Sequence, residues 1–112
     1  MGEEDHLRAG LELMRRGAYF EAHEELELAW RGAEAAERDF FQGLVHVTVA
    51  WYQAGRGNVT GCRRQLEKAA RRLAPYAPEH RGVGVAALLS QVAAADPDAL
   101  PLPPLEIVEP ER

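Results

Sequence analysis

Apolar residues recur along this chain at the three- and four-residue spacing that is typical of amphipathic helices. The first such segment, residues 3 to 16, carries Leu7, Leu11 and Met14 and begins with acids and ends with arginines, as the helix dipole favours. Gly17 follows it, and a second helical segment covers residues 18 to 33. The pattern predicts two helices joined by a glycine turn.

The third predicted helix, residues 40 to 54, is apolar on nearly every side. A helix of this kind is normally central and buried. Asp39 is its expected N-cap. Its polar residues Gln42, His46 and Gln53 lie along one strip, which we expect either to meet water or to face the second helix.

Two further helices and a tail complete the chain. Residues 59 to 73 follow Asn58, a good N-cap, and predict a helix with one apolar face and one arginine-rich face. Residues 82 to 95 predict a short apolar helix. The prolines of residues 96 to 112 exclude a helix there. We expect an extended tail whose aliphatic side chains pack on the bundle or on a neighbouring subunit.

These elements predict an all-α fold, a compact bundle of about five antiparallel helices. Residues 1 to 95 form a single helical domain, and residues 96 to 112 form the Pro-rich extended tail. Arg16-Gly17-Ala18 and Arg56-Gly57-Asn58 both resemble the glycine turn that opens a helix in tetratricopeptide repeats. Two such units are too few for an array, so a helical-hairpin bundle, distantly tetratricopeptide-like, fits better.

The composition is that of an ordinary globular domain. With 112 residues, 46% of them hydrophobic, the chain can bury a core without disulfides. Cys62 is the one cysteine and sits at an apolar helical position, where a core residue is expected. No apolar run is long enough to span a bilayer, and the acidic start lacks the basic region of a secretory signal. We therefore expect a cytoplasmic protein that does not bind membranes.

The charge is unevenly distributed. The net charge is −5, with acids in excess up to Asp39 and bases in excess from Arg56 to Arg81. The overall negative charge argues against a dedicated nucleic-acid binder. Arginine is used almost to the exclusion of lysine, which is consistent with a GC-rich genome and a thermophilic host.

The second segment contains the one motif that suggests a site, His23-Glu24-Glu25-Leu26-Glu27. Helical spacing places Phe20, His23, Glu27 and Trp30 along one stripe, which we expect to face the core. His23 and Glu27 then stand where Leu or Val would be usual. Buried polar groups of this kind require partners.

Three hypotheses follow from this arrangement. In the first, His23 and Glu27 form a buried polar knot that sets the packing of a binding or scaffold module. In the second, the protein is a metal-dependent or acid–base enzyme of hydrolase type, in which His23, Glu24 and Glu27 are the catalytic candidates. Its ligands for a divalent transition metal would be His23, Glu27 and His46, although the HExxE motif lacks the second histidine of a zincin and no cofactor is firmly predicted.

The third hypothesis is binding of RNA or of an acidic partner by the arginine-rich helix of residues 59 to 73. We expect a protein partner or a homodimer, the latter through the aliphatic tail, rather than nucleic acid. His6 and His80 are expected at the surface without a role. The candidate binding residues are Trp30, Gln42, Tyr52, Arg63, Arg64 and Arg71.

The motif Phe20-Glu21-Ala22-His23-Glu24-Glu25-Leu26-Glu27 with Trp30, followed by Phe41-Gln42-Gly43-Leu44 and Gly55-Arg56-Gly57-Asn58, resembles the domain of unknown function 309 family of small bacterial proteins. The resemblance extends over roughly residues 16 to 73. It implies an all-helical bundle with no established activity, and the family pattern often has Gln where this chain has His46. The signature residues fall on Phe20, His23, Glu24, Glu27, Trp30, Gln42 and Gly43.

Overall fold

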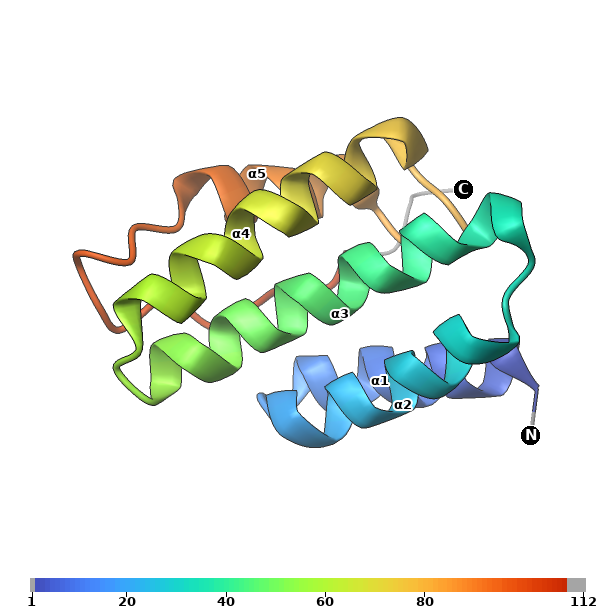
Figure 1. The fold of residues 1–112 in the computed structure, drawn as a ribbon, viewed down its shortest axis with the longest axis horizontal. Coiled ribbons are helices and arrows are strands. Elements are labelled where there is room, and N and C mark those ends of the chain that lie inside the picture. The colour runs from blue at the N-terminus through green and yellow to red at the C-terminus, as the bar shows by residue number, and fades with distance from the viewer. Residues whose placement is uncertain (1, 109–112) are drawn as a thin grey trace.

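The computed structural model of the protein describes residues 2 to 108 and contains five α-helices (Figure 1). They are α1 (Glu3–Arg15), α2 (Tyr19–Gly32), α3 (Ala35–Gly55), α4 (Val59–Leu73) and α5 (Val85–Ala94), with a 3-10 helix, η1 (Ala74–Tyr76), directly after α4. Residues 2 to 108 contain no strand, and one isolated bridge joins His80 to Val83. The predicted all-α bundle is confirmed.

The helices form two layers. In Figure 1, α3 lies in the middle of a front layer between α2 and α4, while α1 lies behind α2 and α5 lies behind α4. Successive helices from α1 to α4 run in opposite directions, so α2 and α4 point the same way. The α1–α2 and α3–α4 turns consequently lie at the same end of the bundle.

The predicted central helix is α3, and it supplies much of the core. Its buried side chains include Phe40, Phe41, Leu44, Val47 and Trp51, and burial of each large one contributes roughly 1.5 to 3 kcal/mol. The predicted α1 stripe is also buried, at Leu7, Leu11 and Met14. None of the helices within residues 2 to 108 combines the length and the apolar character needed to cross a lipid bilayer.

The two glycine turns have the same geometry. Gly17 and Gly57 have φ values of 77° and 73°, in the left-handed region that side chains disfavour. In each turn the glycine N–H bonds back three residues and the following N–H bonds back five, so that Ala18 donates to Leu13 and Asn58 to Gln53. The Asn58 side chain also accepts from Gly61 N–H at 3.0 Å, which confirms the predicted N-cap.

Two predicted helix starts are wrong. Helix α3 begins at Ala35 instead of residue 40, because its first residues are good helix formers. Asp39 is therefore inside the helix, where its carboxylate accepts from Arg72 of α4 at 2.6 Å. Helix α5 begins at Val85 instead of residue 82, because Arg81 and Gly82 have φ values of 48° and 76° and form a turn.

The prediction for the buried face of α2 is also wrong. The side chains that face the core are Ala22, Leu26 and Ala29. The two alanines let α2 lie close to its neighbours. The stripe of Phe20, His23, Glu27 and Trp30 therefore lies at the border between the buried face and the solvent. Phe20 is 45% exposed as a result.

The chain after α5 runs extended along the bundle. The Trp51 indole N–H donates to the Pro103 carbonyl at 2.8 Å, and Leu105 is buried with 4% exposure. The Gln91 side chain bonds both backbone groups of Glu106, at 2.7 and 2.8 Å. Among residues up to 108 the tail thus packs on its own bundle, and the predictions for residues 109 to 112 lie outside the described residues.

Candidate functional site

The His23–Glu27 pair of the HExxE motif lies at the surface edge of α2. The His23 Nδ1 is 2.7 Å from the Phe20 carbonyl oxygen, to which it donates, and its Nε2 is 3.6 Å from Glu27 Oε1. The second distance is too long for a hydrogen bond. Because the side chains are 21% and 40% exposed, the predicted buried polar knot is wrong.

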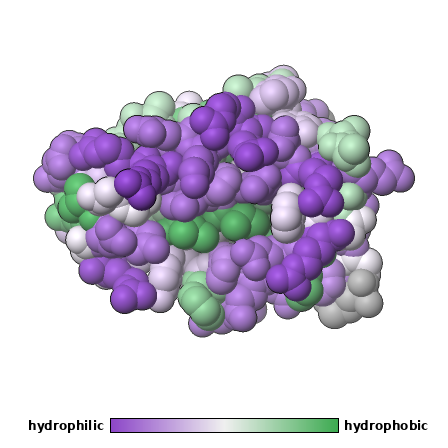
Figure 2. All heavy atoms as spheres, viewed as in Figure 1, coloured by the Kyte–Doolittle hydropathy of each residue, from purple (hydrophilic) through white to green (hydrophobic). Residues whose placement is uncertain are grey.

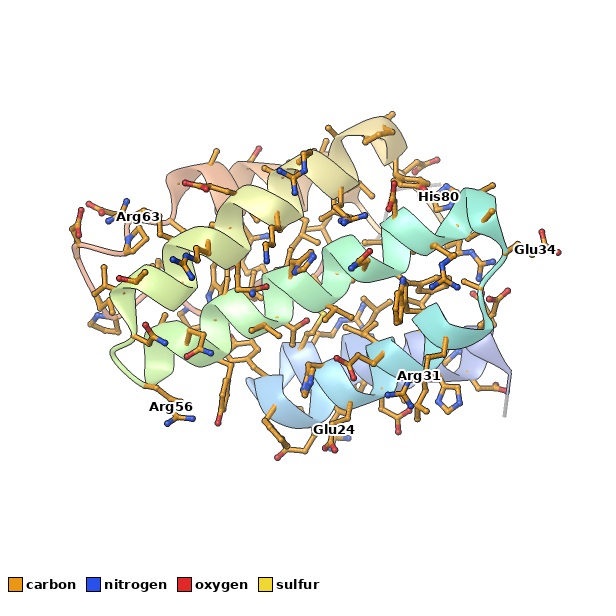
Figure 3. The ribbon with its side chains drawn as sticks, in the orientation of Figure 1. Glu24, Arg31, Glu34, Arg56, Arg63 and His80 are labelled. Carbon is orange, nitrogen blue, oxygen red and sulfur yellow. The ribbon has the colours of Figure 1, made fainter. Side chains whose placement is uncertain are left out.

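Glu24, the third catalytic candidate, is directed elsewhere. It is an exposed residue, and in Figure 3 its side chain points away from α3 at the outer edge of α2. A carboxylate there cannot orient the His23 imidazole toward a shared substrate. The three predicted catalytic side chains are therefore neighbours on one helix without forming a common centre.

His46 faces α4 and not the motif. Its Nδ1 lies 2.7 Å from Gln65 Oε1. Burial lowers the pKa of His46, the bond to Gln65 opposes this, and the charges of Lys68, Arg72 and Arg71 lower the pKa further, so the ring is neutral at pH 7. Residues 2 to 108 include no group of three or more His, Cys, Asp or Glu side chains that could hold a metal ion, and His23, Glu27 and His46 do not form the predicted ligand set.

The candidate binding residues are spread over several surfaces. Tyr52 lies at the turn end of α3, and Trp30 lies at the other end of α2 with the Arg38 guanidinium 4.5 Å from its ring centroid. Arg63 pairs with Asp98 of the tail at 3.0 Å. Gln42 is half-buried, whereas Arg64 and Arg71 are exposed on α4. They do not converge on one ligand.

Two adjoining clefts lie at the turn end of the bundle, where α1, α2 and α3 meet. The first, which we call the turn-end cleft, has a volume of about 440 Å³ and is lined by Tyr19, Phe20, Trp51, Tyr52 and Arg56 together with the backbone of both turns. The second, the tail-side cleft, has a volume of about 340 Å³ and shares Tyr19 and Trp51 with the first. Volumes of this size suit small ligands or peptide side chains.

Aromatic rings form one wall of the turn-end cleft. The Phe20 ring centroid is 5.4 Å from that of Tyr52 and 5.1 Å from that of His23, in tilted arrangements. Arg56 donates to the Tyr52 hydroxyl at 3.2 Å and lies over the Tyr52 ring. The sequence pattern placed Phe20 in the core, whereas it is 45% exposed, so this surface was missed; the pair of glycine turns was the available signal.

Comparison with known families gives one match. The family model described as domain of unknown function (DUF309) matches residues 7–65, more than half of the chain. The chain belongs to the DUF309 family. No curated protein and no solved structure matches it. The DUF309 match includes all residues that line the turn-end cleft and ends before the tail that borders the tail-side cleft.

A second polar cluster joins α1 to the loop before α5, and of its members only Glu37 and Phe41 lie within the DUF309 match. Arg81 donates to Glu37 at 2.6 Å, to Glu4 at 2.8 Å and to Glu3 at 3.2 Å, and its guanidinium lies over the Phe41 ring. His80 lies 2.7 Å from the same Glu37 oxygen, so the expectation that it has no role is wrong. These contacts join the loop before α5 to α1 and α3.

The charge state of Glu37 is set by these partners. Partial burial acts to raise the pKa of Glu37, but hydrogen bonds from His80 and Arg81 and their positive charges outweigh it, so the pKa is lowered. Burial likewise acts against the charge of Arg81, and its acidic partners raise its pKa. The cluster is a charged structural joint, and its residues line neither the turn-end cleft nor the tail-side cleft.

Proposed function

We propose that this DUF309 protein is a binding module, and that the turn-end cleft holds an extended segment of polypeptide. The segment would carry proline and leucine side chains with an acidic residue beside them. The single observation that carries this proposal is that the chain's own tail packs in the tail-side cleft, which shares Tyr19 and Trp51 with the turn-end cleft.

The tail supplies the chemistry of the expected ligand. Its residues Pro101, Leu102 and Pro104 border the tail-side cleft. The Trp51 indole donates to the Pro103 carbonyl, and the Leu105 N–H donates to the Tyr19 hydroxyl at 3.2 Å. An aromatic donor that bonds a proline carbonyl, beside rings that receive the apolar side chains, is the usual way in which proline-rich segments are bound.

The turn-end cleft continues this surface beyond Tyr19 without being covered by the tail. Phe20 leaves 45% of its surface exposed there, more than any other large hydrophobic side chain in residues 2 to 108. Exposed rings of this kind at a cleft favour an apolar ligand. Arg56 at the rim points away from the end of α3 (Figure 3), and its charge favours an acidic residue next to the apolar ones.

The acid–base alternative has weaker support. Its candidates His23, Glu24 and Glu27 lie on the outer side of α2, and His23 already uses one ring nitrogen to bond the Phe20 carbonyl. That bond and the ring contact give His23 a different part in the binding hypothesis, because they hold the Phe20 backbone and ring in place at the cleft.

The experiment is a titration of the full chain into a fluorescein-labelled peptide, Leu-Pro-Leu-Pro-Pro-Leu-Glu, that copies residues 100 to 106, followed by fluorescence anisotropy. Phe20→Ala should weaken binding about tenfold or more, since it removes a ring from the cleft wall. Leu28→Ala is the matched control, because Leu28 lies on the same helix with 44% exposure but lines neither cleft. Equal binding by Phe20→Ala and the unaltered chain, or no binding at about 1 mM peptide, would refute the proposal.

A further inference from the structure

A second surface, which adjoins the turn-end cleft at Phe20 and Tyr52, is the outer face of the α2–α3–α4 layer. In Figure 2 an apolar strip runs along the middle of this face, over α3, between two polar borders. The half-buried residues of α3 that turn away from its buried side include Val45 and Val49. We call this surface the layer face.

The border formed by α4 is basic. Arg64, Lys68 and Arg71 are exposed there, and within residues 2 to 108 none of them has an ion-pair partner. Gln65 of α4 lies 2.7 Å from His46 of α3, and Lys68 follows Gln65 by three residues, so Lys68 lies on the side of α4 nearest α3. Arg64 and Arg71 are four residues before and three residues after Lys68, so they lie beside it on the helix surface.

The border formed by α2 carries Glu27, with Glu24 at its outer edge and the exposed Arg31 four residues after Glu27. Glu24 is exposed and, among the described residues, has no ion-pair partner. Glu27 has only loose neighbours, with His23 Nε2 at 3.6 Å and Arg31 at 3.9 Å. The stripe that holds Glu27 also holds Phe20, which touches Tyr52 of α3, so this border too adjoins the layer face.

The two borders cannot neutralise each other within one chain, because α3 lies between α2 and α4 (Figure 1). Other charges of α4 do find partners in the same chain, as Arg63 does with Asp98 and Arg72 does with Asp39. Among the described residues, charges without an ion-pair partner thus lie on both sides of the apolar strip, mainly basic on α4 and mainly acidic on α2, although Glu67 of α4 is also exposed and unpaired.

We propose that the layer face binds a second copy of this chain, with a two-fold axis parallel to α3. Such an axis lays α3 against α3 of the partner and α2 against α4 of the partner, so acids face bases on both sides. Helices α2 and α4 point the same way, so the facing helices run parallel. A two-fold axis across α3 would instead place acids against acids and bases against bases, which costs free energy.

A dimer would use nearly the whole of the layer face, including both borders. The molecule measures 36 Å by 25 Å when viewed onto this face (Figure 1). A stable interface needs about 800 Å² from each partner. The central contact would be small and apolar, and the charged borders would fix its orientation.

Sedimentation velocity of the full chain in about 20 mM and about 1 M NaCl is the test. The expected result is a dimer of 12.4 kDa chains at low salt that dissociates at high salt, because salt screens the exposed pairs. The Lys68→Glu and Arg71→Glu double variant should raise the dissociation constant of the dimer at least tenfold, and so should the Glu24→Arg and Glu27→Arg double variant. An equimolar mixture of the two variants should restore a dimer. In the mixed dimer the acidic α4 border of the first variant faces the basic α2 border of the second, and the two unaltered borders also face each other with opposite charge.

A control variant, Arg8→Glu with Arg63→Glu, reverses two exposed charges away from the layer face and should leave the dimer intact. A chain that is monomeric at low salt at every concentration up to about 0.5 mM would overturn the proposal. So would a dimer that ignores both border variants. Loss of binding to a single-stranded RNA in the Lys68 and Arg71 variant, with the unaltered chain monomeric, would assign the α4 border to nucleic acid and also overturn it.

Discussion

Replacement of Glu37 with glutamine tests the charged joint between the loop before α5 and the rest of the bundle. The Glu37 carboxylate receives bonds from His80 and Arg81 at 2.7 and 2.6 Å, and its side chain is only 20% exposed. A hydrogen bond to a charged group contributes about 1.5 to 3 kcal/mol. Because Arg81 keeps Glu3 and Glu4 as partners, we expect Glu37→Gln to lower the free energy of unfolding by about 2 kcal/mol at pH 7.

The sign of the pH dependence follows from the lowered pKa of Glu37. A carboxyl group whose pKa is lower in the folded state stabilises the fold above its unfolded pKa, and this contribution is lost as the pH falls through the folded value. Urea unfolding followed by circular dichroism from pH 7 to pH 3 should therefore show a difference between the unaltered chain and Glu37→Gln that shrinks below about pH 4.5. Other acids titrate equally in both proteins, so the difference isolates Glu37.

Glu34→Gln is the control, because Glu34 is exposed at the N-terminus of the same helix and points into solvent (Figure 3). It should change the free energy of unfolding by no more than about 0.5 kcal/mol. A Glu37→Gln effect as small as the control, or one that stays constant between pH 7 and pH 3, would show that the contacts of Glu37 do not stabilise the fold.

Further substitutions test the packing and the edge position of the motif. Gly43→Ala should cost about 1 to 3 kcal/mol in thermal unfolding, because its Cβ would lie 2.6 Å from the buried Leu73 side chain, whereas Gly32→Ala meets nothing within 4 Å and should be neutral or stabilising. Trp51→Phe removes the donor to Pro103 and should cost about 1 kcal/mol and speed amide hydrogen exchange in the tail; unchanged exchange at Leu105 would contradict this. His23→Ala should cost about 1 kcal/mol or less, since it loses a bond at the surface; a loss above about 3 kcal/mol would indicate a buried role.

Much of the fold was predictable because its signals are local. The α1 stripe, the central position of α3 and the Asn58 N-cap all depend on residues within a few positions of one another. The glycine turns are equally local, since the left-handed conformation of Gly17 and Gly57 is a property of the backbone at each turn. The start of α3 was placed too late because Asp39 is a good N-cap by type but has Arg72 of α4 as its partner.

The candidate site was less predictable, because helical periodicity defines which residues share a face but not which face is buried. In α2, either of two stripes of residues could face the core. The core receives Ala22, Leu26 and Ala29, since small side chains allow close packing, and the larger stripe with His23 and Glu27 remains at the edge. The chemistry that was assigned to the His23–Glu27 motif assumed that both side chains are buried.

The sequence by itself determined which segments are helical, the two glycine turns and the membership of the DUF309 family, because each depends on neighbouring residues. Only the tertiary structure decided which side chains meet. Trp51 reaches Pro103 across 52 positions, and Arg81 reaches Glu3 across 78. The physical reason is that such pairs are created by the packing of whole helices, so the aromatic cleft and the opposed charges of the layer face exist only once those helices are assembled.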